Sequence, residues 1–271
     1  MNALRETPTY IVHYSKLVDR SVYLNNIFLG LKIYPTWVTE SNFSNFKPFP
    51  QTYKKIIGVS EKLVGMDLGI NSRSLVYSRR KSKVQGYVLF LRSFFPKQNY
   101  VSIGSLPRKD KLPESQLEVQ RMHLTALVAG VEKNSKWIFV MEDDAIPVNQ
   151  AFENVNEILE ELEAKNTWIN LNSGAGLNRT SSDKKPNKLG LFQVKPPATR
   201  CTAAYLISND LAKKIINSAN SDGIPDWLPI DVYYQVLLRK FKSISYWADP
   251  ATFDQGSENG KYTSGLDKFR Q

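Results

Sequence analysis

Three consecutive acids, Glu142, Asp143 and Asp144, are the residues of this chain whose types and spacing most favour chemistry. They end an apolar run at 137–141 and Pro147 follows, so we expect them where a buried strand leaves its sheet. In open α/β sheets, ligands bind at that edge. Adjacent carboxylates repel each other, which requires a cation or a hydrogen-bond network as compensation. The acids predict either a Mg²⁺ or Mn²⁺ ion bridged to a diphosphate, or an acidic start to the next helix.

Two further acids, Asp226 and Asp231, are candidates for a general base. Asp231 comes early in a helix expected from Pro229 to Lys240, where the helix dipole favours an ionised carboxylate. A base at this position can take the proton of an attacking hydroxyl group. The alternative is that Asp231 only stabilises the start of its helix.

Length and composition indicate a globular protein with an anionic partner. The 271 residues are 42% hydrophobic, enough for one domain or two closely packed lobes. The formal charge of +10 suits a nucleic acid, an anionic membrane surface or a phosphorylated small molecule. No zinc-finger spacing and no RNP-like aromatic run accompanies the basic clusters, so we expect no nucleic-acid partner.

The location of the protein is predicted from what the sequence contains. Cys201 is its single cysteine, so no internal disulfide can form and a reducing compartment is expected. No apolar run approaches the roughly 20 residues that cross a bilayer, and the first residues lack a signal-peptide core. We therefore expect a cytoplasmic protein, with peripheral contact to the inner face of an anionic membrane as a further possibility.

Hydrophobic periodicity predicts an alternation of strands and helices. Strands are expected at 9–14, 33–38, 137–141, 167–171, 202–208 and 243–247, and helices at 16–30, 114–132, 149–165, 210–218 and 229–240. Residues 40–113 have poor periodicity and one possible strand, Gly86–Phe90. Residues 173–200 are expected to form a long loop near the site, since loops of that length are usually functional.

In the order of these parts the chain resembles glycosyltransferase family 25, which includes bacterial lipooligosaccharide galactosyltransferases and collagen galactosyltransferases. The resemblance covers roughly residues 9–38 and 114–265, and four groups of segments carry it: 10–14 with 19–20; 139–145; 202–208 with 212–214; and 229–233 with 249–250 and 255–257. The family has Gly-Glu and Ser-His pairs on the helix before its acidic strand. The aligned positions here are Ser115-Gln116 and Met122-His123, so that only the histidine matches.

The resemblance implies a GT-A fold, a Rossmann-like α/β fold with a central, mostly parallel sheet flanked by helices. One domain, 1–271, would then contain a nucleotide-sugar-binding half at about 9–145 and an acceptor-binding half at about 146–271. The implied metal ligands are Asp144, Asp143 and Glu142, the implied base is Asp231 with Asp226 as the second candidate, and the implied nucleotide-sugar contacts are His13, Tyr14, Arg20, His123, Asp143, Gln255 and Ser257.

For two of these residues, a purely structural role is the alternative to contact with the nucleotide sugar. Arg20 can form a surface salt bridge with Asp19 or Glu6 instead of meeting a phosphate. His123 lies on an apolar helix without a second ligand at metal-binding spacing, which favours a satisfied structural histidine over a ligand.

From these features the expected function is a Mn²⁺- or Mg²⁺-dependent inverting glycosyltransferase. By resemblance, it transfers a hexose, most plausibly galactose, from a UDP-sugar to a saccharide or glycolipid acceptor such as a lipopolysaccharide. The basic loops would steer the anionic donor or hold the protein at an anionic membrane. The alternatives are a sugar- or nucleotide-binding protein without turnover, favoured by Gln116 in place of the glutamate, and a basic nucleic-acid-binding module.

Overall fold

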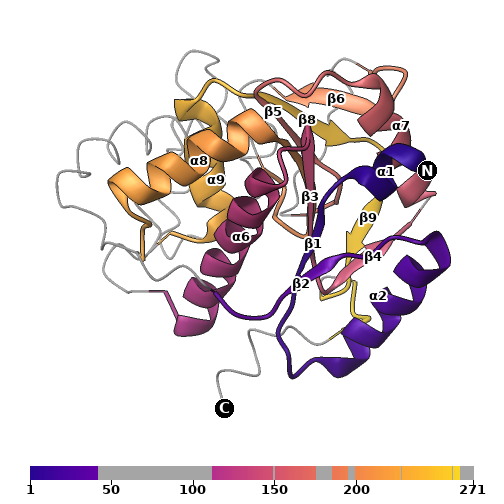
Figure 1. The fold of residues 1–271 in the computed structure, drawn as a ribbon, viewed down its shortest axis with the longest axis horizontal. Helices are drawn as coiled ribbons and strands as arrows, with labels where there is room; N and C mark the ends of the chain where they lie inside the picture. The colour runs from indigo at the N-terminus through magenta and orange to yellow at the C-terminus, as the bar shows by residue number, and fades with distance from the viewer. Residues whose placement is uncertain are drawn as a thin grey trace, which may run out of the picture.

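The computed structural model (Figure 1) describes residues 1–41, 112–148, 150–174, 185–194, 199–226, 228–257 and 259–262. In these ranges the chain has an α/β fold in which helices flank a central seven-stranded sheet. The predicted fold class is confirmed at this level. The possible strand at Gly86–Phe90 lies outside the described residues.

Helices and strands alternate along most of the chain. In order they are α1 (Asn2–Glu6), β1 (Thr9–Val12), α2 (Val18–Leu31), β2 (Thr36–Val38), α6 (Glu114–Glu132), β3 (Trp137–Glu142), β4 (Ala145–Pro147), α7 (Ala151–Glu161), β5 (Thr167–Asn170), β6 (Leu191–Val194), β7 (Ala204–Ser208), α8 (Asn209–Asp222), α9 (Ile230–Lys240), β8 (Ile244–Ala248) and β9 (Phe253–Gln255). None of the helices in the described ranges combines the length and the apolar character needed to span a bilayer.

The central sheet has the strand order β2-β1-β3-β7-β5-β8-β6. Five strands run in one direction, while β7 and β6 run against them. Val12 at the end of β1 is in register with both Val38 of β2 and Glu142 of β3. The three strands therefore end at one edge of the sheet, which brings the residues that follow them together.

Side chains of alternate strand residues enter two separate hydrophobic cores. Ile138 and Val140 of β3 pack in the core beneath α6, α8 and α9. Phe139 and Met141 of the same strand face the other core, beneath α1, α2 and α7. Because both faces of β3 are covered, its sequence is continuously apolar, as is typical of a central strand.

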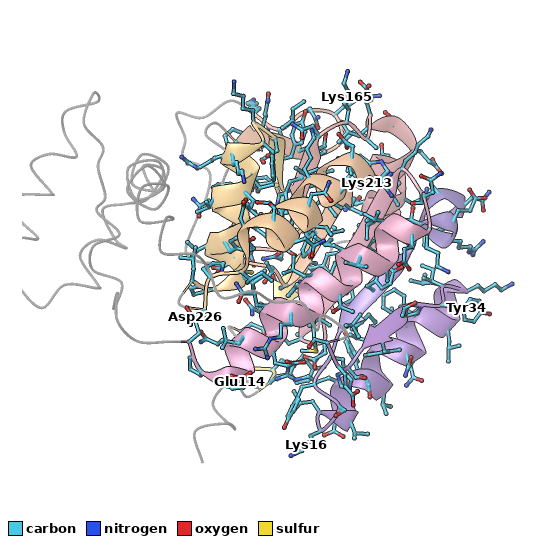
Figure 2. The ribbon with its side chains drawn as sticks, turned by 60° about the vertical axis from the view of Figure 1, so that its left-hand side comes forward. Lys16, Tyr34, Glu114, Lys165, Lys213 and Asp226 are labelled. Atoms are coloured by element: carbon cyan, nitrogen blue, oxygen red, sulfur yellow. The ribbon has the colours of Figure 1, made fainter. Side chains whose placement is uncertain are left out.

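Helix α2 forms an outer layer of the molecule, and Figure 2 shows Lys16 and Tyr34 near its two ends. Leu24 and Phe28 anchor it to the sheet and are almost fully buried. Its other face, with Val18, Val22 and Leu29, is exposed.

Four short elements depart from the sequence-based expectations. β6 lies inside the expected loop 173–200, β9 follows the last expected strand, and α1 precedes the first expected strand. β4 includes Pro147, which was expected to end strand structure; it pairs instead with β9 in a separate two-stranded sheet. Proline is tolerated in such an edge strand, and β4, β6 and β9 form through pairing with strands distant in the sequence, which the pattern of their own residues does not indicate.

Candidate functional site

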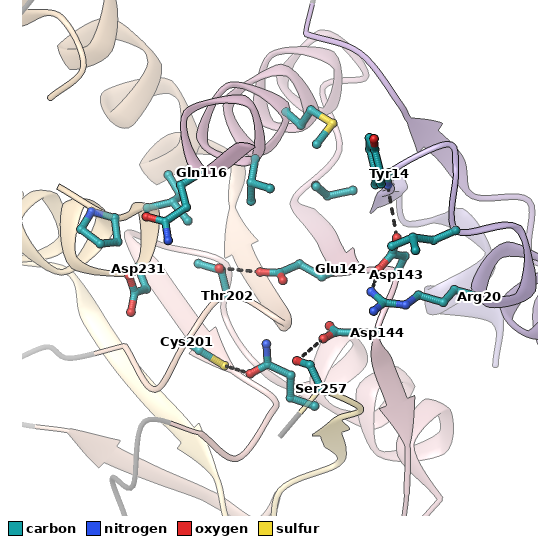
Figure 3. Close-up of a pocket in the computed structure, with 17 residues that line it drawn as sticks. Tyr14, Arg20, Gln116, Glu142, Asp143, Asp144, Cys201, Thr202, Asp231 and Ser257 are labelled. Atoms are coloured by element: carbon teal, nitrogen blue, oxygen red, sulfur yellow. Dashed lines mark hydrogen bonds and ion pairs between the residues drawn. The ribbon is translucent and has the colours of Figure 1, made fainter. Parts of the chain in front are cut away.

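A cavity of about 290 Å³ lies at the edge of the sheet where β1 and β3 end (Figure 3). Its lining contains eight of the eleven predicted site residues: Tyr14, Arg20, Glu142, Asp143, Asp144, Asp231, Gln255 and Ser257. Four of these are acids and one is a base, so the cavity is acidic within a chain of net charge +10. Segments far apart in the sequence thus meet in one polar cavity.

The carboxylate of Asp143 is fully engaged with residues that follow β1. Its Oδ1 accepts a hydrogen bond from Nη1 of Arg20 at 2.5 Å, within a buried ion pair. Its Oδ2 lies 2.9 Å from Nδ1 of His13 and accepts a bond from the backbone N–H of Tyr14 at 3.2 Å. Asp143 therefore ties the end of β3 to the end of β1, and Arg20 pairs with Asp143 inside the protein rather than with Asp19 or Glu6 at the surface.

Asp144, the next residue, is as buried as Asp143 but is only half satisfied. Its Oδ2 accepts a hydrogen bond from the Ser257 hydroxyl at 2.6 Å. Its Oδ1 is buried and, among the described residues, has no hydrogen-bond partner. Burial raises the pKa of Asp144 to about 6, with a further contribution from the charge of Glu142, and the Ser257 hydrogen bond opposes the rise. A cation at Oδ1 would favour the charged form of this carboxylate.

Glu142 is held by two side chains, those of Thr202 and His123. Its Oε1 accepts a hydrogen bond from the Thr202 hydroxyl at 2.6 Å and lies 3.3 Å from Nε2 of His123. The other ring nitrogen of His123, Nδ1, lies 3.1 Å from the hydroxyl of Tyr205. His123 is completely buried and does not line the cavity, so it orients Glu142 from behind the wall.

The segment after β9 reaches both Asp144 and Arg20. Gly256 donates its backbone N–H to the carbonyl of Asp144 at 2.8 Å, next to the Ser257 contact. The ring of Tyr262 packs on the guanidinium of Arg20 at 4.9 Å. A side chain at position 256 would collide with the Tyr262 ring, so glycine permits this close return of the chain.

The opposite wall of the cavity is formed by the start of α9 and by α6. Asp231 lies in the first turn of α9, and its backbone carbonyl accepts a hydrogen bond from the Thr199 hydroxyl at 2.8 Å. Gln116 of α6 also lines the cavity. Asp226 does not: it is exposed at the surface, where its carbonyl accepts the N–H of Leu112 just before α6 (Figure 2). The structure thus brings only Asp231 of the two candidate bases to the cavity.

The described residues fit a metal ion that would be coordinated partly by the protein and partly by the phosphates of a substrate. They contain no group of three or more His, Cys, Asp or Glu side chains arranged as a complete metal site. Mg²⁺ is commonly held by one or two protein carboxylates and by the phosphates of its substrate. The unpartnered Oδ1 of Asp144 offers one such ligand, with Glu142 on the same cavity wall, whereas both oxygens of Asp143 already have donors.

Three contributors to the site were not predicted from the sequence. Thr202 fixes Glu142, Tyr262 packs on Arg20, and the thiol of Cys201 lines the cavity close to Gln255. Thr202 and Cys201 directly precede the strand β7, which pairs with β3, so the strand pairing would have indicated them. Nothing in the type or spacing of Tyr262 indicates its role.

In comparisons with protein-family models and with curated proteins, no family model and no curated protein matches this chain. The resemblance to glycosyltransferase family 25 therefore stays a prediction based on its motifs.

Proposed function

We propose that this protein is a metal-dependent inverting glycosyltransferase of the GT-A type that uses a UDP-sugar donor. The proposal rests on one observation: a single acidic cavity combines a half-satisfied buried carboxylate, Asp144, with a second carboxylate, Asp231, on its opposite wall. The first suits a metal ion and a diphosphate, and the second suits a base. Galactose as the sugar, and a saccharide or glycolipid as the acceptor, are expected from the family resemblance alone.

Each wall of the cavity has its own task in this proposal. Asp144 and Glu142 would hold Mn²⁺ or Mg²⁺, which would stabilise the negative charge on the departing nucleoside diphosphate. Ser257 orients Asp144, and Thr202 orients Glu142, through the hydrogen bonds described above. Asp143 keeps Arg20 and the end of β1 in place. Asp231 takes the proton of the acceptor hydroxyl as that oxygen attacks the anomeric carbon.

The direct test is incubation of the full chain with a panel of nucleotide sugars and Mn²⁺, scored by the release of free nucleotide. We expect release from one UDP-sugar, loss of release in Asp144→Asn, and near-normal release in Asp254→Asn, a matched change of a carboxylate outside the cavity lining. In Asp231→Asn we expect the acidic limb of the pH–rate profile to disappear. Release that persists unchanged in Asp144→Asn would overturn the metal role.

One observation favours a second candidate, a nucleotide- or sugar-binding protein without turnover. Gln116 lines the cavity at a position where the resembled family has glutamate, so the wall formed by α6 and α9 has Asp231 but lacks the second carboxylate that the resemblance implies. This candidate predicts that UDP and Mn²⁺ bind while no nucleotide is released from any sugar of the panel. Restoration of release in Gln116→Glu would attribute the missing turnover to this residue.

A further inference from the structure

The exposed apolar side chains of the molecule are concentrated on one helix. Among the described residues, the large hydrophobic side chains that are exposed are Val18 (59%), Val22 (52%), Leu29 (60%), Tyr34 (80%) and Ile244 (40%). The first three belong to α2, and Tyr34 follows the end of that helix by three residues. Only Ile244 lies elsewhere, at the start of β8.

The three aliphatic side chains form a stripe along the outer face of α2. At about 100° per residue, Val18, Val22 and Leu29 fall within a sector of about 40°, about 120° around the helix from the mean direction of buried Leu24 and Phe28. Exposed Asn25 and Asn26 lie on either side of this sector, and Asp19, the one acid in this helix, is about 80° around from its centre. The outer face of α2 therefore carries an aliphatic stripe bordered by uncharged amides, with one acid at its edge.

Lysines lie at both ends of this stripe, and a third lies over Tyr23, about 120° around the helix from it. Lys16 precedes α2 and Lys32 follows it, and both are exposed. Figure 2 shows Lys16 near one end of the helix and Tyr34 near the other, both directed away from the body of the molecule. Lys261 adds a third exposed ammonium group, 3.9 Å above the ring of Tyr23 on the same helix. An apolar stripe with cations near it is typical of helices that lie in the headgroup region of a bilayer.

We propose that the outer face of α2, with Tyr34, Lys16, Lys32 and Lys261, docks the protein onto an anionic lipid surface. Two arguments favour lipid over a protein partner. The lysines complement anionic headgroups, each contributing about a fivefold gain in affinity. Three protruding side chains on α2 and Tyr34 beyond its end also fall well short of the roughly 20 to 30 residues a side of a stable protein–protein interface, whereas shallow insertion of a few aliphatic and aromatic groups suffices at a membrane.

The geometry gives this surface a relation to the cavity. Tyr14, Leu17 and Arg20 line the cavity, and Lys16 and Val18 of the docking surface lie between them in the chain. Arg20, however, lies about 180° around α2 from the centre of the stripe, so the stripe and the cavity are on opposite sides of this helix. The docking does not rest on the proposed function, since it is measured without any nucleotide sugar.

The test is co-sedimentation of the full chain with vesicles of phosphatidylcholine and phosphatidylglycerol in equal parts, compared with vesicles of phosphatidylcholine alone. We expect binding to the mixed vesicles only. Val22→Gln with Leu29→Gln should weaken it on the order of tenfold, and Ile244→Gln, the exposed hydrophobic residue outside this surface, should leave it unchanged.

A second pair of variants separates the named lysines from the overall charge. Lys16→Glu with Lys32→Glu should weaken vesicle binding by at least about tenfold, while Lys133→Glu with Lys213→Glu, an equal change of charge at exposed positions on other helices, should have a much smaller effect. Equal effects of the two pairs would overturn the assignment of this surface. So would normal vesicle binding by the Val22/Leu29 variant, or self-association of the wild-type chain that this variant abolishes.

Discussion

Asp143 and Asp144 are adjacent in the chain and almost equally buried, at 6% and 4% exposure, yet their surroundings differ in kind. Asp143 has donors on both oxygens, from Arg20, His13 and the backbone of Tyr14. Asp144 has Ser257 on one oxygen and nothing among the described residues on the other. A buried polar atom without a partner is costly, and a ligand that completes its hydrogen bonding or coordination is one explanation for it. The comparison separates an acid that holds the fold from an acid that is available for binding.

The largest effect on stability is expected when Asp143, the fully hydrogen-bonded acid, loses its ion pair. Replacing Arg20 by Met leaves the buried charge of Asp143 without its main partner, which should lower the free energy of unfolding by about 3–5 kcal/mol in urea titrations. Arg121→Met is the matched control, because its ion pair with Glu114 is exposed and should contribute at most about 1 kcal/mol. Equal losses in the two variants would show that the Arg20–Asp143 pair does not hold the fold.

Replacement of Asp144, the acid with one unpartnered oxygen, should raise the stability of the protein instead of lowering it. The folded-state pKa of Asp144, about 6, lies above its ordinary value of 3.8, so the native state binds the proton more tightly than the unfolded state. Stability is therefore lost as the pH rises from about 4 to about 6. In metal-free buffer at about pH 7, Asp144→Asn should raise the free energy of unfolding by up to the order of 3 kcal/mol and flatten its pH dependence.

Asp210 is a carboxylate whose pKa is shifted in the opposite direction, so its replacement should have the opposite effect on stability. Burial alone would raise its pKa, but hydrogen bonds from the Ser208 hydroxyl and the backbone of Asn166 lower it overall. Asp210→Asn should therefore lose stability at neutral pH, and the difference from wild type should shrink as the pH falls towards that lowered pKa. A loss of stability in Asp144→Asn like that in Asp210→Asn would contradict the unfavourable burial of Asp144.

A smaller effect concerns the link between β7 and Glu142. Thr202→Val removes the hydroxyl that donates to Oε1 of Glu142 while it preserves the shape of the side chain. Because Glu142 is partly exposed, the expected loss is about 1 kcal/mol in the same urea titration. Thr252→Val, which removes a buried hydrogen bond to a neutral carbonyl, is the reference. Mn²⁺ affinity should fall in Thr202→Val and stay normal in Thr252→Val.

The smallest expected effect is a change in the pKa of Asp144 when its one hydrogen-bond donor, Ser257, is removed. Ser257 lowers the pKa of Asp144 by donating to the charged form, so Ser257→Ala should move that pKa further upward in an NMR titration of the carboxyl carbon. A downward movement would mean that the hydroxyl does not stabilise the charged carboxylate.

The sequence predicted the long elements and the short strands β1, β2 and β5, but it missed α1, β4, β6 and β9. The helix Glu114–Glu132 has an extended periodic pattern, and β3 has a continuous apolar run, so both were recognised. β4, β6 and β9 have three or four residues each and become strands only through pairing with partners elsewhere. The reversed direction of β7 was equally inaccessible, because periodicity does not contain strand direction.

The site was predictable to the extent that strand ends and sequence motifs mark it. The acids at the end of β3 were placed at the site because a strand ends there, and His13, Tyr14 and Arg20 were assigned to it by the family resemblance. All of these except His13 line one cavity. The partner of Arg20 could not be deduced, since Asp143 lies 123 residues away and nearer acids were available. Asp226 was proposed from its residue type alone, and it lies at the surface outside the cavity.

The most direct test of the division between Asp143 and Asp144 is a calorimetric titration of Mn²⁺ into the full chain in the presence of UDP. We expect wild type to bind the ion, Asp144→Asn to bind it on the order of a hundredfold more weakly, and Asp254→Asn to behave as wild type. Unchanged Mn²⁺ binding by Asp144→Asn would contradict the assignment of Asp144 as the ligand.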